Sequence, residues 1–399
     1  MQLRSFILAI VISHGLGNCW ASDLAIVHAT IYEEPGAKPL VGGTVLVHDG
    51  RIAKVSKDVT LPADTTVLPC DGCVVFAGFW NAHVHFTEPK WLGAATLPRD
   101  KVEQQLRDML THSGFTSVVD TGSDPAVTGA LRRRIESGEV AGPHIRTAGL
   151  PLYPVHALPY YLDGLPAEVK ARLPQPASAD EAQRAVMDNH AAGADITKLF
   201  TGSIVAPDQI TPMRKDIAVA AVAQSHQFGS LVFAHATNLA GVRVALDSGV
   251  DVLAHAPEEL SGIDASLIPD LVRHKLAIIP TLKLFSQDRN IDKIRNVVME
   301  ARRAGVRLVF GTDTGFLEDY DVSEEFHQLD LTGLSVDDIL AMLTTAPAAL
   351  FKIAHRQGRV APGMDADLTI LGSDPNKVGV GAFSDIRYTI RGGKVLFAR

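Results

Sequence analysis

The feature that most constrains this fold is a regular alternation of two kinds of segment between residues 76 and 355. Short runs rich in apolar residues are separated by stretches with the period of an amphipathic helix. There are eight such runs: F-A-G-F-W-N-A-H-V-H, F-T-S-V-V-D-T-G, H-I-R-T-A-G-L, D-I-T-K-L-F, L-V-F-A-H-A, V-L-A-H-A-P, A-I-I-P-T-L and L-V-F-G-T-D. Strands that alternate with helices predict an α/β fold with a parallel sheet.

Six of the seven intervening segments end in a glycine just before the next run: Gly114, Gly138, Gly193, Gly229, Gly249 and Gly305. Glycine permits the left-handed conformation that ends a helix and turns the chain back towards a strand. Eight units of this kind predict a (β/α)8 TIM barrel over residues 76–356, a span close to the usual size of about 250 residues. A doubly wound open sheet is the alternative, but no glycine-rich phosphate loop follows the first run.

The two ends of the chain differ from this central region. Residues 24–75 and 357–399 contain short β-rich pieces, and neither end is long enough to bury a sheet face well by itself. We therefore expect residues 22–75 and 357–399 to form one small β-sandwich domain beside the barrel.

The first 21 residues have the pattern of a secretory signal peptide. Arg4 precedes a short apolar run, which is followed by a small residue, Ala21. This pattern predicts a secreted or periplasmic protein; a buried N-terminal strand and a lipoprotein anchored at Cys19 are weaker alternatives. In such a compartment Cys70 and Cys73 could form a disulfide, although two free thiols are an equal alternative.

Removal of residues 1–21 would leave 36 basic and 45 acidic residues, a net charge of −9. A mild acidic excess spread along the chain argues against nucleic acid and anionic membranes as partners. No second long apolar run suggests a membrane span after signal cleavage. The expected partner is a small-molecule substrate, and the composition leaves a homo-oligomer open.

Polar residues suited to metal binding stand at the ends of five runs: His83, His85, Lys198, His235, His255 and Asp313. In a strand, the period of two places His83 and His85 on one face. In a barrel, the carboxyl ends of the strands meet at one rim, where catalytic groups lie. Imidazole nitrogens and a carboxylate are ligands for zinc-like divalent ions.

With these residues in place, the sequence resembles the amidohydrolase superfamily, and more narrowly its imidazolonepropionase-like and prolidase-like metal-dependent dipeptidase branch. The resemblance covers nearly the whole mature chain. It rests on D-G-C-V-V-F-A-G-F-W-N-A-H-V-H, A-H-A-T, L-A-H-A, G-T-D-T-G, and T-T-A-P-A-A-L-F followed by G-R-V-A-P-G-M-D-A-D-L. It implies a barrel with a flanking β-sandwich.

The resemblance also implies a binuclear centre with two divalent ions, most simply zinc. His83, His85 and Asp313 would bind one ion, and His235 and His255 the other. Lys198 falls where many members carry a lysine carboxylated by CO2, whose carbamate bridges the two ions. A desolvated lysine among cations has a depressed pKa, so its free amine can capture CO2.

The implied activity is hydrolysis of a carbon–nitrogen bond in a dipeptide or N-acyl amino acid. A hydroxide that bridges the metals would attack the carbonyl, and Asp313 would act as general acid and base. Two departures leave the substrate open: T-G-S (201–203) stands where dipeptidase-like members often have Ser-Gly-Gly, and F-T-E-P (86–89) is unusual. A hydrolase of cyclic amides, lactones or xenobiotic amides and a non-catalytic metal-binding protein are the alternatives. Tyr153 and His156, in a segment rich in proline and aromatic residues, are candidates for substrate binding.

Overall fold

The computed structural model describes residues 23–399 except 208, 237 and 259–265. The predicted signal peptide, residues 1–21, therefore lies outside the described residues. Seven of the eight predicted runs contain strands, and these pair in parallel within two sheets. The first sheet contains β6 (Phe79–Val84), β7 (Phe115–Asp120) and β8 (His144–Thr147). The second contains β9 (Ile196–Phe200), β12 (Leu231–His235), β13 (Val252–Leu253) and β14 (Ala277–Ile278).

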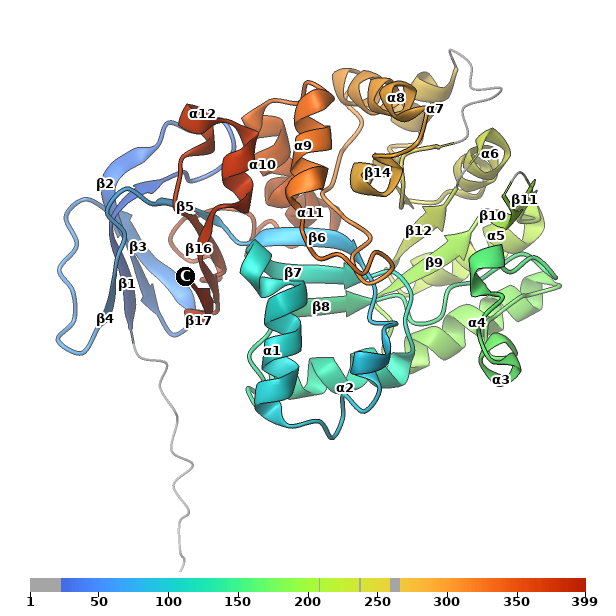
Figure 1. Cartoon of the computed structure of the whole chain (residues 1–399), viewed down its shortest axis with the longest axis horizontal. Coiled ribbons are helices and arrows are strands. Elements are labelled where there is room, and N and C mark those ends of the chain that lie inside the picture. Colours follow the sequence, from blue (N-terminus) through green and yellow to red (C-terminus); the bar gives the residue numbers. More distant parts are fainter. Residues whose placement is uncertain (1–22, 208, 237, 259–265) are drawn as a thin grey trace, which may run out of the picture.

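A helix lies between each pair of successive runs, as the sequence pattern predicts (Figure 1). These helices are α1 (Arg99–Met109), α2 (Pro125–Glu136), α4 (Ala179–Ala191), α5 (Lys215–Gln227), α6 (Leu239–Ser248), α7 (Leu267–Arg273) and α8 (Ile291–Arg303). Four more follow the eighth run: α9 (Ser323–Leu331), α10 (Val336–Leu343), α11 (Thr345–Leu350) and the short α12 (Pro375–Val378). All six glycines that precede a run have positive φ, which confirms their predicted left-handed conformation.

Local sequence explains where several helices begin. The Asp124 carboxylate accepts the Ala126 N–H at the start of α2, where Pro125 occupies the first helical position. The Ser178 hydroxyl accepts the Glu181 N–H at the start of α4. These caps fix the points at which the chain leaves a strand-end loop and enters the next helix.

The two parallel sheets are joined by isolated bridges and not by continuous ladders. Leu152 bridges to Leu199, Ile278 to Leu308, and Val84 to Thr314, all in parallel orientation. The last two bridges place the eighth run, residues 308–313, between the seventh run and the first. Pairing is short here because Pro280 has no N–H and because Thr281 and Asp313 have positive φ, which ends a strand. The α/β order is therefore as predicted, while the described residues do not form one continuous closed sheet.

Side chains from all eight runs meet in one apolar cluster. Its buried members are Trp80, Ala82, Val119, Ala148, Ile196, Phe233, Val252, Ala254, Ala277, Ile279, Val309 and Leu350. A separate and larger cluster packs the other faces of the strands against the helices. The strands therefore bury apolar side chains on both faces, as parallel strands covered by helices do.

The two chain ends share a second β region, in which blue and red strands lie side by side in Figure 1. Its strand order is β17-β16-β15-β5-β1-β2-β3, and β4 pairs with β1. The strands are β1 (Leu24–Ile31), β2 (Leu40–His48), β3 (Arg51–Ser56), β4 (Thr66–Pro69), β5 (Val74–Ala77), β15 (Leu368–Leu371), β16 (Ile386–Arg391) and β17 (Lys394–Ala398). The antiparallel pairing of β5 with β15 joins the N-terminal strands to the C-terminal ones.

The structure also decides between the two alternatives left open for the cysteines. Cys70 and Cys73 are joined by a disulfide, and both are buried in the apolar cluster of this β region. Among the described residues, no helix has both the length and the apolar character needed to cross a bilayer.

Candidate metal centre

The six residues that the sequence singled out all stand at or just beyond the carboxyl ends of the parallel runs. His83 lies in β6 and His85 follows it; Lys198 lies in β9, and His235 ends β12. His255 follows β13, and Asp313 ends the eighth run. Because these strands are parallel, their carboxyl ends open on the same side of the fold.

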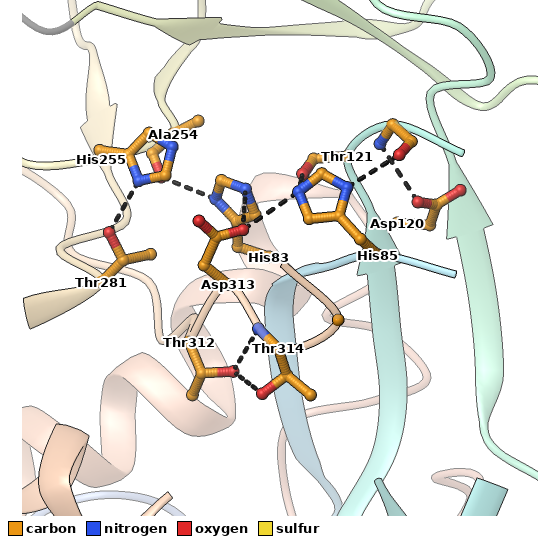
Figure 2. A network of polar contacts seen from close by, with 12 residues as sticks. His83, His85, Asp120, Thr121, Ala254, His255, Thr281, Thr312, Asp313 and Thr314 are labelled. Carbon is orange, nitrogen blue, oxygen red and sulfur yellow. Dashed lines mark hydrogen bonds and ion pairs between the residues drawn. The ribbon is translucent and has the colours of Figure 1, made fainter. Parts of the chain in front are cut away.

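His83 and His85 both point at Asp313 (Figure 2). The Nε2 atom of His83 lies 3.2 Å from Asp313 Oδ1, and the Nε2 atom of His85 lies 3.1 Å from the same oxygen. The prediction that the two imidazoles share a face is therefore confirmed. The pairing of β6 with β7 is irregular between Asn81 and Val84, so the two histidines lie where the regular strand pairing is interrupted.

The hydrogen bonds of the two rings fix their tautomers. His83 Nδ1 lies 2.8 Å from the carbonyl oxygen of Ala254, and His85 Nδ1 lies 2.8 Å from that of Gly122. A carbonyl oxygen only accepts hydrogen bonds, so Nδ1 of each ring carries the proton and donates it. In the neutral rings, each Nε2 then presents a lone pair.

Two lone pairs and a carboxylate oxygen thus face one another in a buried place. The side chain of His83 is fully buried and that of Asp313 is 6% exposed. His83 Nε2 and Asp313 Oδ1 are buried without a hydrogen-bond partner among the described residues, as is Nε2 of His235. Buried acceptors that repel one another need a cation between them. Two ligands of a tetrahedral zinc ion lie about 3.3 Å apart, which fits these spacings.

His255 and His235 extend this group. The His255 ring centroid lies 4.6 Å from that of His83 and 4.8 Å from that of His235. Ligand atoms of His83, His255 and Asp313 all fall within 4.8 Å of one another. The residues present therefore fit one divalent ion, and His235 adds a ligand atom beside it for a second.

Lys198 is buried among these groups, with 1% of its surface exposed. Burial lowers the pKa of its amine to about 8, although Asp313 and Asp120 oppose that shift. About a tenth of the amine is therefore uncharged at pH 7, far more than for an exposed lysine, and the uncharged form is the one that reacts with CO2.

Burial also sets the charge of the imidazoles. It lowers the pKa of His83, His235 and His255 well below the ordinary value, and the nearby Lys198 cation adds to the effect. These three rings are therefore neutral, as metal ligands must be. For His85, burial acts in the same direction, but Asp313 and Asp120 outweigh it and raise the pKa.

Asp120, at the end of β7, supports the orientation of the His85 ring through Gly122. It is fully buried and accepts hydrogen bonds from Ser123 Oγ and Thr147 Oγ1, both at 2.6 Å, and from the Gly122 N–H at 3.1 Å. It thereby holds Gly122, whose carbonyl orients the His85 ring. The sequence reasoning overlooked Asp120, although its place at the end of the second run, in V-V-D-T-G, was a usable signal.

Asp313 itself adopts φ = +60°, a conformation that few non-glycine residues take. Its N–H donates to the carbonyl of His83 at 2.9 Å, and its own carbonyl accepts from Phe316 and Leu317. Behind it, a Cβ on Gly315 would lie 1.9 Å from the His85 carbonyl oxygen, so only glycine fits there. Contacts with the first run thus hold the strained Asp313 backbone in place.

Aromatic rings surround the buried polar groups. Phe200 stacks on His235, with ring centroids 4.5 Å apart, and lies tilted against Tyr153 at 4.4 Å; Tyr161 meets Phe316 edge to face at 5.3 Å. Tyr161 is 37% exposed and Phe316 48% exposed, which is unusual for large rings.

Of the two predicted substrate-binding residues, Tyr153 belongs to this aromatic group. His156 is exposed and has φ = +54°; among the described residues, no contact joins it to the metal-binding candidates. The sequence reasoning missed Phe200, Tyr161 and Phe316. Phe200 stands two residues after Lys198 in one strand, so the period of two could have placed it on the same face.

Comparisons with known proteins identify the family and the fold of this chain. A sequence model of the Amidohydrolase family matches residues 74–396. Among solved structures, a Xaa-Pro dipeptidase with bound methionine in its active site superposes with a TM-score of 0.78 at 20% identity, covering 94% of this chain and 99% of that one. A Bifidobacterium longum protein assigned as a prolidase gives 0.76 at 27% identity, with 94% and 95% covered. Molinate hydrolase gives 0.78 at 17% identity, with 94% and 95% covered.

Proposed function

Because this chain belongs to the amidohydrolase family, we propose that it is a metal-dependent hydrolase that cleaves the carbon–nitrogen bond of a dipeptide or N-acyl amino acid. Family membership and the prolidase-like neighbours support a hydrolase. One observation carries the proposal for this chain. Nε2 of His83 lies 3.2 Å from Asp313 Oδ1, and both atoms are buried acceptors without a hydrogen-bond partner among the described residues, which calls for a cation.

In this proposal, His83, His85 and Asp313 hold one divalent ion and His235 and His255 hold a second; zinc suits this ligand set. Lys198 joins them as a carbamate, whose negative charge would lie among the cations. When bound, such ions lower the pKa of a water molecule and polarise a carbonyl group.

Asp313 is the group that moves protons. Oδ1 lies 3.1–3.2 Å from both Nε2 atoms, and the left-handed backbone with its contacts to the first run fixes the carboxylate in that place. It takes a proton from the attacking water and gives it to the departing nitrogen. Positioned general acid–base groups contribute about 10²- to 10⁴-fold to rate.

The aromatic rings support a substrate with a large apolar group. Tyr161 and Phe316 are exposed and pack edge to face, the Phe316 N–H donates to the Asp313 carbonyl, and Phe200 contacts both Tyr153 and His235. We propose that these four rings contact the apolar side chain of the substrate next to the bond that is cleaved.

The same proposal includes the finer architecture. Isolated bridges from the first run to the eighth, and one apolar cluster with side chains from all eight, support a TIM barrel over residues 76–356. The sheet shared by both chain ends supports a separate β-sandwich domain of residues 22–75 and 357–399. We also propose that residues 1–21 direct export to the periplasm or the exterior.

A substrate screen after metal analysis tests the function. The purified chain should contain about two divalent ions, lose activity to a chelator and regain it with zinc. It should cleave dipeptides and N-acyl amino acids with Phe or Leu side chains faster than those with Gly, by about 10- to 200-fold. Cleavage of cyclic amides or lactones alone would move the assignment to those substrates. Bound metal without any hydrolysis in the screen would refute the enzyme and indicate a binding protein.

A further inference from the structure

We propose that Glu325 is a positioning residue that holds the His255 imidazole in its metal-binding orientation by fixing the backbone turn at Thr281. The inference rests on the proposed function, because it takes His255 to be a metal ligand. Glu325 lies in α9, beyond the eighth run, and no motif in the sequence singled it out.

The first step is the contact between His255 and Thr281 (Figure 2). His255 Nδ1 lies 2.8 Å from Thr281 Oγ1, and that hydroxyl donates to the Pro280 carbonyl oxygen at 2.9 Å. Since the hydroxyl has a single proton, Oγ1 must accept the proton of His255 Nδ1. The second nitrogen, Nε2, is therefore left with a lone pair, and the hydrogen bond orients the ring.

The second step is that Thr281, at the position where it contacts His255, has a strained backbone conformation. Its backbone has φ = +47° and ψ = +47°, and the residue is fully buried. A β-branched residue in the left-handed region is a true outlier, and such a conformation persists only where its surroundings enforce it. The chain next to Thr281 must therefore be anchored.

The third step is that Glu325 supplies this anchor. Thr281 precedes the short helix η4 (Leu282–Phe285). Glu325 Oε2 accepts the Lys283 N–H of that helix at 2.7 Å. The Lys283 side chain adds a second tie, because its Nζ donates to the Asp319 carboxylate at 3.0 Å and to the Asp321 carbonyl. The turn that orients His255 is thus bound to the segment that follows Asp313.

The burial of Glu325 is costly, which argues that it is more than a surface cap. The side chain is completely buried, and burial raises the pKa of its carboxyl to about 7. No hydrogen-bond partner of Oε1 appears among the described residues. A carboxyl group kept in such a place without full hydrogen bonding lowers stability, so a role in the site explains its presence better than stability does.

Metal affinity of the full-length chain tests the inference. Zinc dissociation constants are measured by competition with a chromophoric chelator for wild type, Glu325→Ala and Glu325→Gln. Loss of an outer partner of a metal-binding histidine typically weakens binding about 10- to 100-fold, and we expect this loss for one of the two ions in Glu325→Ala. Glu325→Gln keeps an acceptor oxygen for the Lys283 N–H and should restore affinity to within about threefold of wild type. Glu324→Ala, one residue earlier on α9, is the matched control and should bind both ions normally.

A second readout separates positioning from stability. In metal-free protein, the nitrogen-15 shifts of His255 should report the Nδ1–H tautomer in wild type and Glu325→Gln, and a mixture of tautomers in Glu325→Ala. If Glu325→Ala does not fold, Glu325→Asp takes its place, because its shorter side chain withdraws the carboxylate from Lys283. Folded variants that bind both ions as wild type does, or equal losses in the Gln and Ala variants, would overturn the proposal. A wild-type chain that binds no zinc would instead refute the proposed function, before any variant is made.

Discussion

Two clusters of histidine and carboxylate lie at opposite ends of the parallel strands, and they differ in how their charges are satisfied. At the carboxyl ends, the His83 and His85 rings point lone pairs at Asp313. At the amino end of β8, His144 lies between two carboxylates: Nε2 is 3.3 Å from Asp367 and Nδ1 is 3.6 Å from Glu136.

The pKa values of His83 and His144 are shifted in opposite directions. Burial leaves His83 neutral by lowering its pKa. Burial also lowers the pKa of His144, and the Arg391 guanidinium acts in the same direction. Hydrogen bonds to Asp367 and Glu136 outweigh both, so the pKa of His144 is raised. The His144 ring is therefore stabilised in its protonated form, whereas His83 Nε2 and Asp313 Oδ1 are buried acceptors without a hydrogen-bond partner among the described residues. Histidines beside carboxylates do not by themselves indicate a metal; unsatisfied acceptors do.

The largest expected effect comes from removing one carboxylate from each cluster. Asp313→Asn should lower kcat by about 10²- to 10⁴-fold while most of the metal remains bound, because the amide cannot shuttle a proton. Asp367→Asn should leave kcat near the wild-type value and lower stability by about 1–3 kcal/mol, because the His144 and Gln357 side chains lose a buried acceptor. Steady-state kinetics, metal analysis and urea unfolding measure these effects. Full turnover in Asp313→Asn would remove Asp313 from its proposed role.

A second comparison concerns the buried cations of the two clusters. Arg391 pairs with Glu136, whereas no ion pair joins Lys198 to a carboxylate among the described residues. If Lys198 carries a carbamate, Lys198→Ala should lose at least about tenfold in activity and regain part of it with added formate or acetate. Lys215→Ala, which removes an exposed pair with Asp247, is the control and should need no rescue. Failure of rescue together with a single bound ion would favour a mononuclear site.

The sequence predicted the residues of the site better than it predicted the residues that hold them in place. His83, His255 and Asp313 could be found because each ends an apolar run, and parallel strands bring such ends to one rim. Thr281 and Glu325 were not found, since their roles depend on a backbone turn and a long-range contact that no local period encodes. The short length of the sixth and seventh strands could not be predicted either. Apolar runs indicate burial, but the number of paired residues depends on the turns around Pro280 and Asp313.

The smallest expected effect is the pH dependence of the His144 cluster. Because the folded-state pKa of His144 is raised above its unfolded value of about 6.5, the stability that it contributes is fully present below about pH 6.5. This contribution is lost as the pH rises through the folded-state pKa. The side chain is 36% exposed, so the contribution should not exceed about 1 kcal/mol.

His144→Gln should therefore destabilise the metal-free protein at pH 6 and cost less at pH 9, as measured by urea unfolding in the presence of a chelator. Glu136, whose pKa is lowered mainly by its hydrogen bond to His144, is ionised throughout this interval and does not affect it. A cost that is equal at both pH values, or larger at pH 9, would show that His144 is neutral in the fold. The contrast between the His144 cluster and the cluster of His83 and Asp313 would then no longer hold.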